Sequence, residues 1–398
     1  MLLASGCDSE HQPLPMPDDP TGLHDRLVVE FQLAVDRTTS QVKTRAGAPL
    51  ATDNESWDDP YPTTDASEFD VTLDSLNPVL YAVKDDGSLD LESANIAGTV
   101  SIVTKQRSET SGRVVYNITG ILQTTLTAEE LRAGNFRLAI FANAYPSDPA
   151  AAGSLSFNYY GTPLSTTPVA FPAIPMWGVA KADLSDIEMG QLKHLADVDL
   201  LRAMAQVRMR VSDELFAVKD DEHPDGREVR LVSMSLNRMN SSGYVVPGDW
   251  NTLTSTNKLL FTNTLNELSS PLLGGFTVTA DPDAELAEGE VSSEQLLSFY
   301  LPEVSNSDDP ANELVLTLRY TTDGIEEIRE NTVHFSRYTA DGTYDESAEK
   351  WDILRNHIYE YKITGVGTAY TPELEVCIKQ WRYEKFNGEL GSDSEWHQ

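Results

Sequence analysis

The stretch Leu27-Val28-Val29-Glu30-Phe31-Gln32-Leu33-Ala34-Val35 indicates the fold class most directly, because large apolar side chains alternate in it with Glu30 and Gln32. The period of two places four apolar side chains on one face of an extended chain: Val29, Phe31, Leu33 and Val35. This pattern is typical of a β-strand with one face in a core and the other in solvent.

The same alternation returns at residues 232–236, 314–320 and 359–364. Between such runs lie tight-turn sequences rich in Asp and Gly, which suit hairpins. They are Asp85-Asp86-Gly87, Asp225-Gly226, Ser242-Gly243, Thr322-Asp323-Gly324 and Ala340-Asp341-Gly342. Many short strands at this spacing predict an all-β protein made of antiparallel sandwiches, not a parallel sheet with crossover helices.

Helical signals are few. The clearest begins at Thr127, where Glu130 stands at the third helical position of a capping box and Gly134 supplies the stop. A second, weaker helix is predicted over Leu184–Leu201, a polar stretch with faint periodicity.

Length, charge and cysteine content limit the number of domains, the class of partner and the source of stability. The chain has 398 residues, which at about 150 residues per domain predicts two domains. The formal net charge of −34 repels phosphate backbones, so we expect no nucleic-acid partner. Two cysteines do not supply a disulfide framework, so stability must come from packing.

The first residues resemble the end of a bacterial lipoprotein signal. Small residues precede a cysteine in Leu3-Ala4-Ser5-Gly6-Cys7, and residues 8–22 have the proline-rich, acidic composition of a linker. We therefore predict a signal remnant, lipobox and tether over 1–22, with Cys7 diacylated and holding the chain to outer-membrane lipid. The alternative is an ordinary thiol after a chance apolar start. The two predicted sandwich domains then cover 23–190 and 191–398.

No residue pattern indicates catalysis. No two of the seven histidines lie within four residues of each other, and phosphate-binding, dinucleotide-binding and nucleophile-elbow motifs are absent from the sequence. The acidic run 220–226 lacks EF-hand spacing and is expected to be a solvated loop. Cys377 is expected on the polar face of a strand. The sequence therefore predicts no enzyme, no metal and no cofactor.

Several segments together resemble the fimbrillins, the lipoprotein-derived pilins of Bacteroidales that build type V pili. Their order and spacing cover nearly the whole chain. They are Leu3–Cys7, Leu27–Val35, Thr44-Arg45-Ala46, Phe136–Ala144, Pro175–Gly178, Leu200–Val207, Phe299–Glu303, Arg355–Tyr359 and Lys379-Gln380-Trp381.

The resemblance implies two transthyretin-like sandwich domains and a surface-exposed outer-membrane lipoprotein that polymerises into a fimbria by strand exchange. An arginine-specific protease would remove the first strand; Arg45 matches the family's cleavage position best and Arg37 is the second choice. Alternation then marks residues 374–381 as the candidate donor strand, with its apolar face at Leu374, Val376 and Ile378.

Other pilus subunits are the implied partners, together with surface ligands of the host or of other bacteria. Two alternatives stay open. In the first, the chain is a non-polymerising anchor or tip adhesin of the same pilus. In the second, it is a surface glycan-binding lipoprotein. The glycan-binding alternative expects exposed aromatic platforms, for which Trp57 and Tyr159-Tyr160 are the candidates, although packing in a core or at an edge is also open to them.

Overall fold

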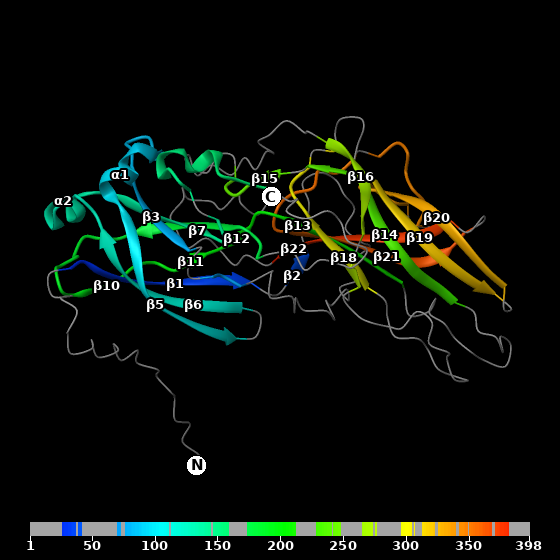
Figure 1. Cartoon of the computed structure of the whole chain (residues 1–398), viewed down its shortest axis with the longest axis horizontal. Coiled ribbons are helices and arrows are strands. Elements are labelled where there is room, and N and C mark those ends of the chain that lie inside the picture. Colours follow the sequence, from blue (N-terminus) through cyan, green and yellow to red (C-terminus); the bar gives the residue numbers. More distant parts are fainter. Residues whose placement is uncertain are drawn as a thin grey trace, which may run out of the picture.

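The structure is a computed structural model, and its two main groups of strands follow each other along the long axis of the molecule (Figure 1). The residues it describes are 26–36, 39–41, 70–72, 76–110, 113–144, 146–158, 173–211, 228–240, 242–247, 265–273, 275–276, 296–304, 306, 313–322, 325–339, 342–348, 350–367 and 371–381.

The first group is one ten-stranded sheet whose two halves enclose a hydrophobic core. A single residue pair, Val79 with Thr99, joins the halves. The strands in order are β10 (Leu192–His194), β1 (Val28–Asp36), β6 (Arg113–Gln123), β5 (Thr99–Thr110), β3 (Asn77–Val83), β7 (Phe136–Ala142), β9 (Met176–Ala182) and β12 (Leu201–Arg202), with β11 (Val198–Asp199) on β1 and β4 (Leu89–Asp90) on β3.

The second group is a sandwich of two sheets around a separate core, to which Leu316, Tyr359 and Leu374 belong. The six-stranded sheet contains β17 (Gly275–Phe276), β18 (Leu296–Leu301), β13 (Ala205–Val211), β21 (His357–Val366), β22 (Pro372–Trp381) and β2 (Thr39–Gln41). The four-stranded sheet contains β16 (Leu265–Leu273), β14 (Glu228–Asn240), β19 (Glu313–Thr322) and β20 (Ile325–His334).

The prediction of a mostly β protein with few short helices is confirmed. Strand direction is less uniform than predicted, because β1 runs parallel to β10 and β11, and β13 runs parallel to β21. Alternation of side chains defines the face that a strand buries, but it contains no information on the direction of the neighbouring strand.

The predicted helix at Thr127 is confirmed as α2 (Ala128–Ala133), with its capping box formed and Gly134 at its end. The Thr127 hydroxyl accepts from the Glu130 backbone N–H at 3.2 Å, and the Glu130 carboxylate accepts from the Thr127 N–H at 2.8 Å. The other described helices are α1 (Ala94–Ala97) and two 3₁₀ segments, η4 (Leu91–Ser93) and η5 (Pro149–Ser154).

The helix predicted over Leu184–Leu201 is wrong. This stretch contains β10 and β11 and leads into β12. The backbone groups along one side of β1 offer it partners, and pairing with them outweighs the stretch's weak helical preference.

Two of the turn predictions illustrate where local sequence suffices. At Gly87 the backbone φ is +85°, a conformation that glycine adopts at no steric cost, and the chain reverses there between β3 and β4. Ser242-Gly243, in contrast, is not a turn but belongs to β15 (Ser242–Tyr244), which pairs with β8 (Ser156–Asn158). None of the described helices is long and apolar enough to cross a membrane.

The chain passes from the first core to the second between Met204 and Ala205. The three strands β10 to β12 follow the predicted boundary at 190 in sequence, yet they pair with β1 and β9 of the first sheet. We propose two domains with the boundary placed accordingly at about residue 205.

Candidate functional site

Strand β1 occupies a slot between two neighbours and is not an edge strand. On one side it pairs antiparallel with β6 over its whole length, from Val28 with Ile121 to Asp36 with Arg113. On the other side it pairs parallel with β10 and β11. Backbone hydrogen bonds from Leu195 N to Glu30 O (2.8 Å) and from Leu200 N to Ala34 O (2.9 Å) complete that side. Loss of β1 would therefore expose unpaired backbone groups on both walls of the slot.

The floor of the slot is apolar. Val29, Leu33 and Val35 are fully buried and Phe31 is 2% exposed, so the apolar face predicted from the alternation is confirmed. Each such side chain contributes about 1.5 to 3 kcal/mol by leaving water, so the four together contribute at most about 6 to 12 kcal/mol. The opposite face is mixed, because Glu30 and Gln32 lie on it between the buried residues Val28 and Ala34. Its Glu30 carboxylate lies 2.8 Å from Nδ1 of His194 on β10.

Strand β22, the predicted donor, lies within the sheet of its own chain. It pairs antiparallel with β21 from Gln380 opposite His357 to Pro372 opposite Val366. Leu374 is 2% exposed, and Val376 and Ile378 pack against the second core from a half-buried position. The apolar face predicted for this segment therefore exists, but here it belongs to the second sandwich.

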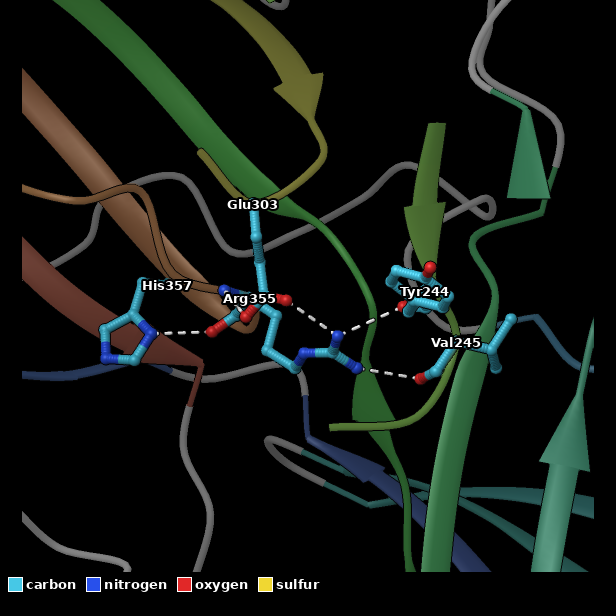
Figure 2. A network of polar contacts seen from close by, with 5 residues as sticks. All are labelled: Tyr244, Val245, Glu303, Arg355 and His357. Atoms are coloured by element: carbon cyan, nitrogen blue, oxygen red, sulfur yellow. Dashed lines mark hydrogen bonds and ion pairs between the residues drawn. The ribbon is translucent and has the colours of Figure 1, made fainter. Parts of the chain in front are cut away.

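A polar network centred on Arg355 ties three segments together where the two groups of strands meet (Figure 2). The guanidinium donates to the carbonyls of Val245 (2.8 Å) and Tyr244 (3.1 Å) and forms an ion pair with Glu303 at 2.7 Å. Val245 itself packs in a cluster with Trp177 on the outer side of the first sheet. The network therefore links the loop before β21 to a segment packed on the first sheet.

His357 belongs to the same network, because its Nδ1 lies 2.6 Å from the Arg355 carbonyl oxygen. Burial lowers the pKa of His357 below its ordinary value of 6.5, although the Arg355 carbonyl and the Glu303 charge oppose this shift. At Nδ1 the neutral ring donates to the carbonyl, and protonation of the other nitrogen would place a charge in a partly desolvated site.

We expect stability to fall as the pH is lowered below about 6.5, where the unfolded chain binds a proton that the folded His357 does not accept. Above that pH His357 is neutral in both the folded and the unfolded chain, so its titration no longer lowers the free energy of unfolding. His357→Asn keeps a donor to the carbonyl and removes the titration, so its unfolding free energy should depend on pH less steeply, by up to about one bound proton. Urea unfolding of both proteins at several pH values measures the difference; equal slopes would contradict the assignment.

Several predicted residues lie outside the described residues: Cys7, Arg37, Arg45, Trp57, Tyr159, Tyr160 and the acidic run 220–226. Cys377 is placed opposite Glu360 in the β21–β22 ladder, and its predicted exposure stays a prediction. Within the described ranges, no three His, Cys, Asp or Glu side chains gather in a way that would hold a metal ion.

Sequence reasoning missed the parallel partners of β1, the pairing of β2 with β22 and the Arg355 network. Each joins residues far apart in the chain: Arg355 and Val245 are 110 positions apart. Arg355 lies in one of the segments that resemble the fimbrillins, but no local pattern assigns it a partner. A pair of residues varying together among homologues is the signal that would have found such contacts.

No known family model matches the sequence, and no curated protein sequence matches it. Solved structures do resemble it. A candidate cell adhesion protein from Parabacteroides distasonis matches with 12% identity and a TM-score of 0.41, over 91% of this chain and 98% of that one. The tip fimbrial protein Mfa3 from Porphyromonas gingivalis, with a C-terminal truncation, matches with 12% identity and a TM-score of 0.37, over 88% and 100%. A fimbrial assembly protein from Parabacteroides distasonis matches with 14% identity and a TM-score of 0.33, over 88% and 95%.

Proposed function

We propose that the chain is a structural subunit of a cell-surface fimbria, exported as a lipoprotein, cleaved by an arginine-specific protease and polymerised by strand exchange. The observation that supports this most strongly is the position of β1. The first described strand of the chain fills an interior slot of the first sheet, and two arginines, Arg37 and Arg45, follow it closely in sequence. One cut after either arginine would separate the strand from the rest of the chain.

The physical logic is strand replacement. An empty slot presents unpaired N–H and C=O groups of β6, β10 and β11 above an apolar floor, and a strand from another subunit satisfies both at once. The incoming strand would lie antiparallel to β6, as β1 does. It would also need large apolar residues at every second position, which residues 374, 376 and 378 provide.

The proposed location is the outer surface of the outer membrane and the fimbria itself. Acyl chains on Cys7 would hold the precursor to the membrane through the tether 8–22, because two or more chains give stable anchoring. Arg45 is the preferred cleavage position and Arg37 the second. Other pilus subunits, and through the fimbria the surface ligands of other cells, are the proposed partners.

The anchor or tip role is the second candidate, and one observation favours it. In this structure β22 is held by β21 along its length, and Leu374 lies in the core of its own chain. A subunit that does not donate a strand would keep β22 in this place, whereas a shaft subunit must release it.

Treatment of the purified full chain with an arginine-specific protease separates these roles. We expect wild type and Arg37→Gln to lose residues 1–45 and to form a ladder of oligomers on gels, and Arg45→Gln, which keeps the second-choice position Arg37, to form fewer. The double variant R37Q/R45Q is the control that stays monomeric. A chain that remains monomeric after clean removal of residues through Arg45 would contradict the shaft role.

A further inference from the structure

Strand β2 lies in a different sheet from β1, although only two residues separate them in sequence. β1 ends at Asp36 in the first sheet, and β2 begins at Thr39 at the margin of the six-stranded sheet. There it pairs antiparallel with the end of β22: Thr39 with Trp381, Ser40 with Gln380 and Gln41 with Lys379 (Figure 1). The segment that processing would remove therefore pairs with both groups of strands.

Because of this pairing, the last residues of β22 have a paired strand on each side. Lys379 and Gln380 have β21 on one side, opposite Ile358 and His357, and β2 on the other. The earlier part of β22, from Pro372 to Ile378, has no pairing with β2. A strand end with two neighbours is held by two ladders, whereas an edge strand has one and opens at lower free energy.

We propose that β2 is a brace that keeps the carboxy-terminal end of β22 in its own sheet until processing removes it. A cut after Arg45 would take away β1 and β2 together, so the slot would open and residues 379–381 would become a free strand edge in one event. A cut after Arg37 would open the slot and leave β22 braced. A processing site beyond β2 therefore has a physical reason, because only a cut there releases both strands.

The uncovered edge of β22 is then a surface for strand pairing, and the partner that it fits is a second copy of this chain. Opening would begin at residues 379–381, where one ladder has been lost, and would proceed toward Leu374, which is the most buried of the predicted donor residues. This last step rests on the proposed function, whereas the bracing itself does not.

Hydrogen exchange of the uncut full chain tests the brace. Thr39→Pro with Ser40→Pro removes the backbone donor of β2 at both successive positions, so whichever faces β22 is lost. Thr39→Ala with Ser40→Ala is the matched control that keeps both donors. We expect amide exchange at residues 379–381 to become about tenfold faster in the proline variant only, with exchange in β6 unchanged. Two results would overturn the proposal. One is equal exchange at residues 379–381 in both variants, and the other is an increase in β6 of the proline variant as large as the increase at 379–381.

The cleaved chains provide a second measurement. After the released peptide has been washed away in mild denaturant, R37Q cut after Arg45 should show faster exchange at residues 379–381, and R45Q cut after Arg37 should not. The same change in both would overturn the brace. Oligomers without any change in exchange at β22 would also overturn it while supporting the proposed function. Faster exchange without oligomers would support the brace and contradict the shaft role.

Discussion

Replacing Phe31 by alanine is expected to lower the free energy of unfolding of the first sheet by about 3 to 5 kcal/mol. Phe31 is 2% exposed and packs in the first core from the middle of β1. Truncation removes the transfer free energy of the ring and leaves a cavity, because β6 holds the backbone of β1 in place through pairing along its whole length. Urea denaturation measures the loss of unfolding free energy, and hydrogen exchange of the β6 amides measures it separately for the first sheet.

Gln32→Ala is the matched control for Phe31. Gln32 is the next residue on the same strand, is partly exposed and pairs with Asn117 on the opposite face. Its replacement is expected to change stability by no more than about 0.5 kcal/mol. Similar effects of the two substitutions would mean that β1 does not contribute its apolar face to the core, and the slot would then have no hydrophobic basis.

Replacing Glu360 by alanine is expected to destabilise the second sandwich by about 3 to 5 kcal/mol. Oε1 of Glu360 lies 2.9 Å from Nε of Arg210 on the neighbouring strand β13, and the two side chains are only 3% and 9% exposed. Loss of the carboxylate leaves a guanidinium with little access to water and without this counter-charge. The cost is therefore far larger than for an ion pair at the surface.

Glu375→Ala on β22 is the control for this prediction, because Glu375 is exposed and lies two strands away from Arg210 in the same sheet. We expect it to change the unfolding free energy by no more than about 0.5 kcal/mol. The midpoint and slope of urea unfolding give the change in unfolding free energy for both substitutions. Exchange of the β21 amides measures the change separately for the second sandwich. A loss of less than about 1 kcal/mol for Glu360→Ala would contradict a buried, interdependent pair.

Much of the local structure was predictable from the sequence. The alternation at residues 27–35 defines both a strand and its buried face, and the capping box at Thr127 defines the start of α2. These signals are local: a strand shows its period within a few residues, and a cap joins groups three positions apart.

The rest depends on contacts that no short pattern contains. In β13 the sequence alternates between apolar residues and Gln206, Arg208 and Arg210, which on its own predicts a solvated face. All seven residues of the strand are nevertheless buried. Arg208 donates to Gln206 at 2.8 Å and Arg210 pairs with Glu360 from another strand. Likewise, β10 and β11 form strands because the backbone of β1 pairs with them. That pairing is a tertiary contact, which the local sequence of β10 and β11 does not contain.

The most direct test of strand exchange is an engineered disulfide between subunits. If residues 374, 376 and 378 replace apolar residues of β1 with the same direction, Cys377 takes the place of Gln32 or Ala34, which pair with Asn117 and Val115 on β6. A disulfide requires Cα atoms within about 7 Å, which adjacent strand partners satisfy.

The measurement is the yield of covalent dimers after mild oxidation of Asn117→Cys and Val115→Cys chains that lack Cys7. We predict that one of them forms an intermolecular disulfide with Cys377 after removal of residues 1–45, that the uncut chain forms none, and that Cys377→Ser abolishes the bond. Oligomers that assemble after cleavage without a disulfide from either position would contradict the donation of β22 into the slot left by β1.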